Sequence, residues 1–128
     1  TSIEHNKQWL LNVKNILPNI YLNKWKYYLR PSSVNGNCIG SGDDEYYDEY
    51  VNVVDSLDTF DIIIIDGRCR SKCINKTINK LNPGGLYVVD NAERPAYRNA
   101  INNIPKNWIS HIFKTRVDTT IVWIKPII

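Results

Sequence analysis

Three oxygen-bearing side chains follow two apolar runs in this sequence. Asp66 comes directly after Ile62–Ile65, and Asp90 and Asn91 come directly after Leu86–Val89. Two carboxylates and an amide oxygen are hard ligands that suit Mg²⁺ or Ca²⁺ better than zinc. If the three groups meet, they predict a divalent-cation site. In the alternative, Asp66 contacts a cofactor or orders its own loop, and Asp90 caps the turn that follows.

Three arginines, Arg68, Arg70 and Arg94, stand close to the same apolar runs. A guanidinium group binds a carboxylate or a phosphate through two parallel hydrogen bonds. We therefore expect these arginines to bind an acidic group of a substrate. In the alternative, Arg68 and Arg70 pair with Asp66, Asp90 or Glu93.

The elements that must position these residues are two strands. Ile62–Ile65 and Leu86–Val89 are short apolar runs without polar alternation, a pattern typical of strands that are covered on both faces in a parallel sheet. The segment between them is long enough for the helical crossover that parallel strands require. Ligands bind beyond the carboxyl ends of such strands, so we predict that the acids share one functional edge.

The rest of the chain alternates strands and helices, which predicts a single α/β domain over residues 1–128. Asn82–Gly85 is expected to end the crossover helix and turn the chain into the next strand, and the glycine-rich segment 36–42 is expected to form a flap. The expected strands are Thr1–Glu4, Ile20–Tyr28, Asp61–Asp66, Leu86–Val89, Trp108–Thr115 and Thr119–Lys125. The expected helices follow Asn6, Asp43 or Asp44, Arg70 and Arg94.

Composition excludes several classes of function. The net charge of +3 is small and its basic residues are dispersed, so there is no clear nucleic-acid footprint. No apolar stretch approaches the roughly 20 residues that span a bilayer. Three cysteines, Cys38, Cys69 and Cys73, with no signal-like segment before them, favour a reduced, cytoplasmic setting. Their spacing does not predict a zinc site.

Four segments together resemble the class I S-adenosylmethionine-dependent methyltransferases: Ser2–Asn6, Phe60–Gly67, Asn82–Gly85 and Val88–Asn91. The resemblance covers nearly the whole chain, but only from the second strand of that family onward. The family's first strand and its glycine-rich cofactor turn have no counterpart, as in an N-terminally truncated or reduced relative. This absence implies either a gap in the sheet or pairing of Thr1–His5 with Phe60–Asp66.

The resemblance also implies a fold and roles for individual residues. The fold is a Rossmann-like sheet, mostly parallel with a C-terminal antiparallel hairpin, and with helices on both faces. Glu4 would hold the cofactor ribose with His5 beside it, and Asp66 and Gly67 would complete the cofactor site. Asp66 would be the catalytic residue. The acidic pattern is also similar to metal-dependent catechol and caffeoyl-coenzyme A O-methyltransferases, although Cys69 stands where those enzymes have a lysine base.

The expected function is transfer of a methyl group from S-adenosylmethionine to an oxygen or nitrogen of a small-molecule acceptor. The substrate would lie above Asp66, Asp90 and Asn91, with Arg68, Arg70 and Arg94 around it and a cation such as Mg²⁺ as an optional aid. One alternative is a truncated methyltransferase-fold module that binds or assembles, for example as a homodimer, without catalysis. The other is an aminopropyltransferase, which the arginines disfavour.

Overall fold

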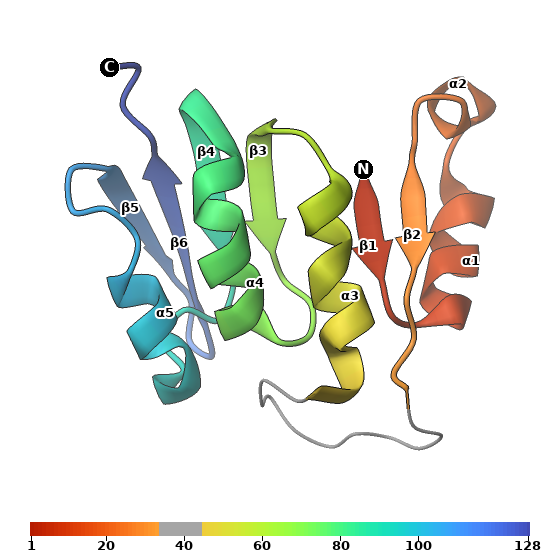
Figure 1. Ribbon diagram of the computed structural model, residues 1–128, viewed down its shortest axis with the longest axis horizontal. Helices are drawn as coiled ribbons and strands as arrows, with labels where there is room; N and C mark the ends of the chain where they lie inside the picture. The colour runs from red at the N-terminus through yellow and green to blue at the C-terminus, as the bar shows by residue number, and fades with distance from the viewer. Residues whose placement is uncertain (34–44) are drawn as a thin grey trace.

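The computed structural model describes residues 1–33 and 45–128, which form a mixed α/β arrangement (Figure 1). A four-stranded sheet has the order β3-β4-β6-β5, and β1 and β2 form a separate two-stranded sheet. The strands are β1 (Ser2–Glu4), β2 (Tyr27–Leu29), β3 (Phe60–Ile65), β4 (Leu81–Val89), β5 (Ile109–Lys114) and β6 (Thr119–Ile124). The α/β prediction is confirmed. The expectation of a mostly parallel sheet is not, because the described pairs are two parallel and two antiparallel.

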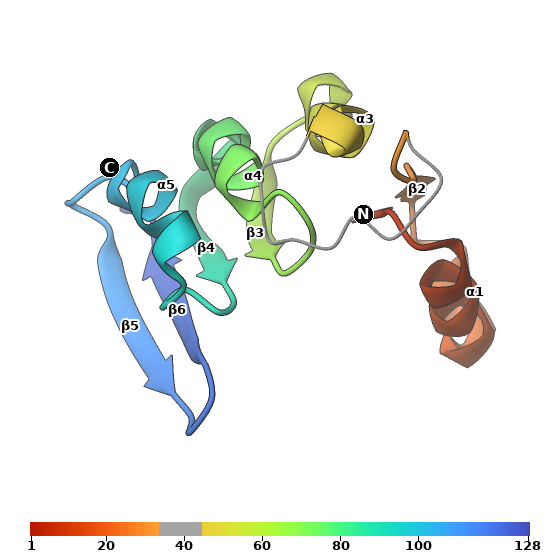
Figure 2. The ribbon, with the colours of Figure 1, turned by 90° about the horizontal axis from the view of Figure 1, so that it is seen from below.

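The helices cover the two sheets unevenly. Figure 2 shows α3, α4 and α5 on one face of the four-stranded sheet, whereas α1 lies on the opposite side, beside β1 and β2. Helices on both faces are therefore found only when both sheets are taken together. The helices are α1 (Lys7–Ile16), α2 (Asn19–Leu22), α3 (Asp48–Asn52), α4 (Arg70–Thr77) and α5 (Arg98–Asn102), with 3₁₀ turns at Glu45–Tyr47, Val53–Ser56, Ile78–Lys80 and Pro95–Tyr97.

The two apolar runs lie side by side and point the same way, as predicted. Ile62 pairs with Leu86 and Ile65 with Val89 in a parallel register. The ladder continues past the strand ends, where the Asp90 N–H donates to the Ile65 carbonyl at 3.1 Å. The ends of β3 and β4 therefore reach one edge of the sheet.

Helix α1 begins where the sequence predicted. The side-chain oxygen of Asn6 accepts a hydrogen bond from the Trp9 backbone N–H at 3.0 Å, which satisfies one of the unpaired donors of the first turn. Of this helix only Leu10 is buried, and Trp9 and Ile16 are exposed. The described residues therefore cover only part of the apolar surface of this helix.

The predicted strand Ile20–Tyr28 is wrong over most of its length. Residues 19–22 form the short helix α2, and only Tyr27–Leu29 pair as β2. Pro18 explains the difference, because its carbonyl accepts hydrogen bonds from the N–H groups of Tyr21 and Leu22, at 2.9 and 3.3 Å. A proline at the start of a turn favours a helix more strongly than the alternating side chains favour a strand here.

Asn82–Gly85 was predicted to be a turn, but these residues belong to β4. Lys125, which follows β6, holds this segment in an extended conformation. The Gly84 N–H donates to the Lys125 carbonyl at 2.9 Å, the Lys125 N–H donates to the Gly85 carbonyl at 3.0 Å, and the Lys125 ammonium donates to the Leu81 carbonyl at 2.6 Å. The pairing of β3 with β4 has a register shift between Phe60 and Ile62, next to this segment.

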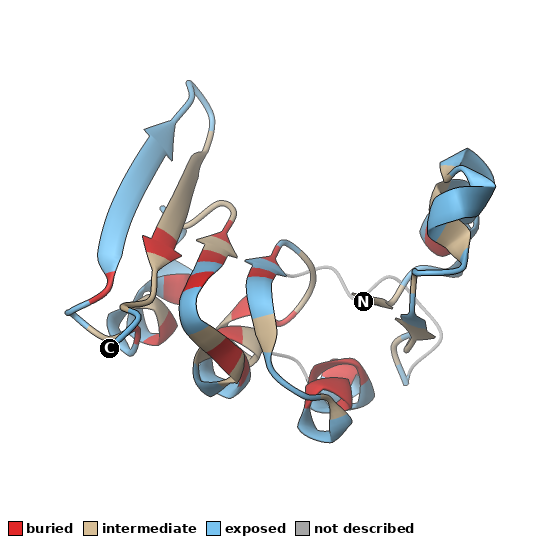
Figure 3. Cartoon of the chain, turned by 90° about the horizontal axis from the view of Figure 1, so that it is seen from above, coloured by how far each residue is buried: buried red, intermediate tan, exposed pale blue. Residues whose placement is uncertain are grey.

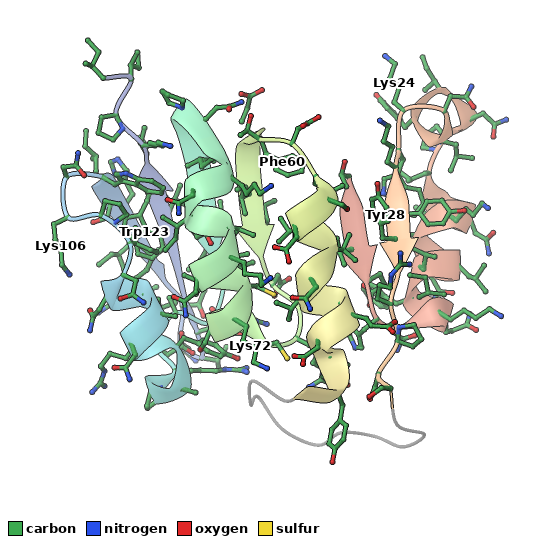
Figure 4. The ribbon with its side chains drawn as sticks, viewed as in Figure 1. Lys24, Tyr28, Phe60, Lys72, Lys106 and Trp123 are labelled. Atoms are coloured by element: carbon green, nitrogen blue, oxygen red, sulfur yellow. The ribbon has the colours of Figure 1, made fainter. Side chains whose placement is uncertain are left out.

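The main core lies between the four-stranded sheet and helices α4 and α5. Tyr87 is fully buried, and its hydroxyl hydrogen-bonds with the Thr77 hydroxyl. The rings of Trp108 and Trp123 pack edge-on against Tyr87. Trp123, labelled in Figure 4, belongs to β6. Both tryptophans are buried, whereas Trp9 is exposed. Within the described ranges, none of the helices combines the length and the apolar character needed to cross a bilayer.

Candidate functional site

A cavity of about 820 Å³ separates β1 from β3. Among residues 1–33 and 45–128, β1 pairs with β2 alone and β3 with β4 alone, so of the two arrangements expected from the sequence the structure has the gap. The strands run in the same direction (Figure 1), and residues at their carboxyl ends form one rim of the cavity. These rim residues are Glu4, His5, Asn6, Asp66, Gly67 and Arg68. All four residues predicted to bind the cofactor are among them.

Glu4 is held at this rim through one of its two carboxylate oxygens. Its Oε1 accepts hydrogen bonds from the backbone N–H groups of His5 and Asn6, each at 2.8 Å, and lies 3.0 Å from His5 Nδ1. Within residues 1–33 and 45–128, Oε2 makes no hydrogen bond. The arrangement fixes the side chain and leaves one anionic oxygen for a hydroxyl donor of a ligand.

His5 lies among aromatic rings behind Glu4. Its ring packs edge-on against Tyr47 and Tyr50, with centroids 5.7 and 6.0 Å away. Burial lowers the pKa of His5; the Glu4 carboxylate acts in the raising direction and Arg68 in the lowering direction. The imidazole is therefore neutral at pH 7.

Tyr50 is a cavity residue that reasoning from the sequence did not place. The sequence pattern places Tyr46, Tyr47 and Tyr50 on one helical stripe. In the structure Tyr46 is exposed and Tyr50 lines the cavity. Burial raises the pKa of the Tyr50 phenol, and the Cys73 thiol and Glu4 add to the rise. The phenol thus stays protonated and supplies a hydroxyl beside the Arg68 backbone. The spacing of the stripe was the only available signal.

Arg70 connects the ends of β3 and β4 beneath the rim. Its guanidinium donates to the carbonyls of Gly67, Asp66 and Asp90, and also to Asp66 Oδ1 at 3.1 Å and Asn91 Oδ1 at 3.2 Å. The side chain is buried and lies 5.7 Å from the centre of the Tyr97 ring. The guanidinium donates to oxygens of the protein itself. These contacts therefore do not support the predicted role of Arg70 in substrate binding.

Asp66 and Asp90 form an unequal carboxyl pair around Arg70. Desolvation raises the pKa of Asp66; the Arg70 charge opposes the rise, and Asp90 contributes to it. The pKa of Asp90 is lowered, chiefly because its Oδ1 accepts a hydrogen bond from the Thr120 hydroxyl at 2.7 Å. Asp66 is therefore the member of the pair that holds a proton more readily.

The remaining predicted substrate residues lie on the other side of β3 from the cavity. Asp90, Asn91 and Arg94 follow β4 and are not among the residues that line it. Asn91 adopts a left-handed conformation with φ 50°, and its carbonyl accepts from the Arg94 N–H at 3.2 Å. Arg68 is the predicted substrate arginine that does line the cavity. Asp66 belongs to both groups: it lines the cavity with Arg68, and it is joined to Asp90 and Asn91 through Arg70.

The oxygens predicted to bind a divalent cation do not fit one in this arrangement. The Arg70 guanidinium contacts Asp66 and Asn91 and lies 3.9 Å from Asp90 Oδ2, so it occupies the space between the three groups. Its positive charge already compensates the carboxylates. The described residues also contain no cluster of three or more His, Cys, Asp or Glu side chains suited to a metal.

Comparison with known proteins gives one distant likeness. No protein-family model matches the chain, and no curated protein matches it. Among solved structures, the crystal structure of a methyltransferase from Pyrococcus furiosus matches with a TM-score of 0.44 and 17% sequence identity. The alignment covers 98% of this chain and 62% of that chain. At this TM-score and identity, the likeness by itself assigns no activity.

Proposed function

We propose that this chain forms the cofactor and acceptor site of an S-adenosylmethionine-dependent methyltransferase with a Rossmann-like fold. The observation that carries the proposal is the shared rim, where Glu4 and His5 from the end of β1 meet Asp66 and Gly67 from the end of β3. These are the four positions to which the family resemblance gives a cofactor role, and they line one cavity.

The chemistry of the rim suits a nucleoside cofactor. Ribose hydroxyls donate hydrogen bonds, and a carboxylate at the end of a strand is their usual acceptor in doubly wound sheets. Glu4 meets this need, because its backbone contacts use Oε1 and leave Oε2 for a ligand. The Tyr50 hydroxyl and the neutral His5 ring provide further polar and flat surfaces at the same rim.

Asp66 is the residue to which we assign the acceptor's proton. S-adenosylmethionine, when bound, supplies an electrophilic methyl group to an oxygen or nitrogen nucleophile. The raised pKa of Asp66 makes its carboxylate a better proton acceptor than an ordinary aspartate, and its side chain is 64% exposed at the rim. Arg70 holds the carboxylate in position from below. No metal is needed for these roles.

The acceptor we propose is a small molecule with an acidic group. Arg68 lines the cavity, and a guanidinium there can bind a carboxylate or a phosphate. Arg94 is exposed beyond Asp90 and is left as a second contact for a larger acceptor. A reduced, cytoplasmic setting fits buried thiols such as Cys69.

Calorimetric titration with S-adenosylmethionine and its demethylated product tests the proposal. We expect both to bind the native chain and Glu4→Gln to weaken binding about tenfold or more, because a charged acceptor becomes neutral while an oxygen remains for the backbone donors. Asp58→Asn, at an exposed position outside the cavity lining, should bind like the native chain. An absence of heat at millimolar ligand, or equal affinity for the Glu4→Gln variant, would remove the proposal.

A further inference from the structure

The charged residues of this chain are distributed unevenly. Residues 34–67 contain nine Asp or Glu residues and no Lys or Arg, whereas residues 5–33 contain no Asp or Glu and five basic residues: Lys7, Lys14, Lys24, Lys26 and Arg30. Along the sequence these five are too widely spaced to form a clear nucleic-acid footprint. In the structure, four of them lie beside the strand β2, as the contacts below show.

A cation and two aromatic rings lie on the α1 side of β2. The Lys14 ammonium, which comes from α1, is 5.5 Å from the centre of the Tyr27 ring and donates a hydrogen bond to the Tyr27 hydroxyl at 3.3 Å. The centre of the Trp25 ring is 4.8 Å from that of Tyr27. Lys14 and Tyr27 are exposed, and Figure 3 shows that α1 is exposed over most of its length. This side of β2 therefore presents both charge and flat apolar surface to the solvent.

A second cation and ring lie on the other side of the same strand. The Arg30 guanidinium carbon is 5.9 Å from the centre of the Tyr28 ring. Lys26 is two residues before Tyr28, so in an extended chain its side chain projects on the same side, and Lys24 is in the turn before it. Figure 4 labels Lys24 and Tyr28 in this part of the molecule. We define the basic edge as these four cations and three rings: Lys14, Lys24, Lys26, Arg30, Trp25, Tyr27 and Tyr28.

The cations of the basic edge have no acidic partner among the described residues. The ion pairs of residues 1–33 and 45–128 join other groups to carboxylates, namely His5, Arg70, Lys72 and Lys76. An aromatic ring attracts a cation but carries no net charge, so the rings position Lys14 and Arg30 without neutralising them. β2 is also an edge strand, because in this part of the chain it pairs with β1 alone. The basic edge can therefore bind an anionic group from outside.

Cations interleaved with aromatic rings indicate a single-stranded nucleic acid as the ligand. Proteins bind such strands through basic residues that follow the phosphates and through aromatic side chains on which the bases stack. An acidic peptide needs only the cations, and in a duplex the bases already stack on each other. Glu49 of α3 lines the same small groove as Tyr28 and Arg30, so phosphates are repelled from the α3 side. A bound strand is therefore expected to run along the outer edge and the α1 side of β2.

We propose that the basic edge binds single-stranded RNA or DNA, with phosphates on its four cations and a base against the Tyr27 ring. None of its residues lines the cavity between β1 and β3, so it is a second site. One end of the basic edge reaches the rim of that cavity, since the Arg30 N–H donates to the Glu4 carbonyl at 2.8 Å. The proposal does not depend on the proposed methyltransferase function.

Fluorescence anisotropy of labelled oligonucleotides tests the proposal on the native chain. The probes are a mixed-sequence RNA of about 12 nucleotides, the DNA of the same sequence and the DNA duplex. Four phosphate contacts predict that the logarithm of the association constant falls against the logarithm of the salt concentration with a slope of about −2.8, which is about a 50-fold loss of affinity between about 50 and 200 mM salt. We expect the single strands to bind with this slope and the duplex to bind at least about fivefold more weakly at about 200 mM salt. The tighter of the two single strands identifies the preferred source.

Matched variants separate the basic edge from the general charge of the protein. The double variant Lys24→Gln/Lys26→Gln removes two of its cations and should reduce the size of the slope by about 1.4. Lys106→Gln/Arg116→Gln removes two exposed cations near β5 and should leave the slope unchanged; Lys106 is labelled far from Lys24 in Figure 4. Tyr27→Leu should weaken binding about fivefold or more at an unchanged slope. Tyr27→Phe should bind like the native chain, because stacking needs the ring and not the hydroxyl.

Three results would overturn the proposal. One is no change in anisotropy with about 100 μM protein at about 50 mM salt, where even non-specific binding is measurable. Another is an equal loss of slope in Lys106→Gln/Arg116→Gln. The third is equally tight binding of the duplex, or of poly-glutamate of the same charge, because the stacking of free bases would then contribute nothing. Titration with S-adenosylmethionine measures a separate site, so failure of the proposed function would leave this test intact.

Discussion

The Tyr50 hydroxyl fills the space in which a side chain at residue 67 would begin. A Cβ on Gly67 would overlap this hydroxyl and would lie 3.2 Å from Tyr50 Cζ. The same hydroxyl is hydrogen-bonded to the Arg68 backbone, which contributes to its pKa. Helix α3 therefore fixes the path of the loop after β3, and glycine is required there by close approach.

Replacement of Gly67 by alanine should destabilise the protein by about 1–3 kcal/mol, as overpacking of a close contact typically does. In a Tyr50→Phe background the cost of Gly67→Ala should be smaller, because the overlapping oxygen is gone. Urea unfolding of the four proteins in this cycle measures the difference. A Tyr46→Phe background, where the ring is exposed, is the matched control. An equal cost of Gly67→Ala in all three backgrounds would contradict the assignment.

Arg70→Lys should lower the free energy of unfolding by about 2–4 kcal/mol. The planar guanidinium donates to backbone and side-chain oxygens at the ends of both β3 and β4, and an ammonium group cannot satisfy them together. Chemical denaturation gives the value. Arg116→Lys, at an exposed position in the β5–β6 turn, should change it by less than about 0.5 kcal/mol. A similar effect of both substitutions would argue against the role of Arg70.

Asp90→Asn should lower the pKa of Asp66. The raised pKa of Asp66 arises first from desolvation and also from the neighbouring Asp90 charge, so removal of that charge favours ionisation of Asp66. Carboxyl carbon chemical shifts followed against pH measure this change. Asp58→Asn, at an exposed position before β3 begins and so at the other end of that strand from Asp66, should leave the Asp66 titration unchanged. An unchanged Asp66 titration in Asp90→Asn would show that the two carboxyls are not coupled.

The stability of the native chain should fall as the pH drops below about 6.5 through the titration of His5. The pKa of His5 is lowered from 6.5 in the folded state, so the unfolded chain binds the proton more readily. Unfolding therefore takes up a proton between the lowered pKa and 6.5, and the contribution of His5 is fully present only above this range. The difference between native and His5→Gln unfolding curves from pH 5 to 8 isolates it. A difference that does not vary with pH would contradict the prediction.

The sequence predicts the central strands well because their signal is local. Two apolar runs without polar alternation indicate neighbouring parallel strands, and the pairing of Ile62–Ile65 with Leu86–Val89 confirms this. The expected coverage of both faces is wrong for β3, because Ile62 and Ile64 are exposed. The cap at Asn6 is equally local. The rim residues Glu4 and Asp66 could also be placed, since each directly follows a strand.

Other features depend on contacts between distant segments. The extended path of residues 82–85 is set by hydrogen bonds to Lys125, which no local pattern of prolines and glycines reveals. Tyr50 reaches the cavity because α3 packs beside Gly67, and the helical stripe alone does not distinguish it from its neighbours. The hydrogen bonds of Arg70 to the ends of β3 and β4 could not be predicted either, because they also join segments that are distant in the sequence. The predicted flap 36–42, Cys38 and the helix cap at Asp43 or Asp44 lie outside the described residues.

The bonds from Lys125 to Leu81, Gly84 and Gly85 bear on how the protein is handled in the laboratory. These hydrogen bonds fix the first residues of β4. Proteolytic cleavage at Lys125 should therefore destabilise a strand in the middle of the sheet. An engineered change in this segment should therefore leave Lys125 in place.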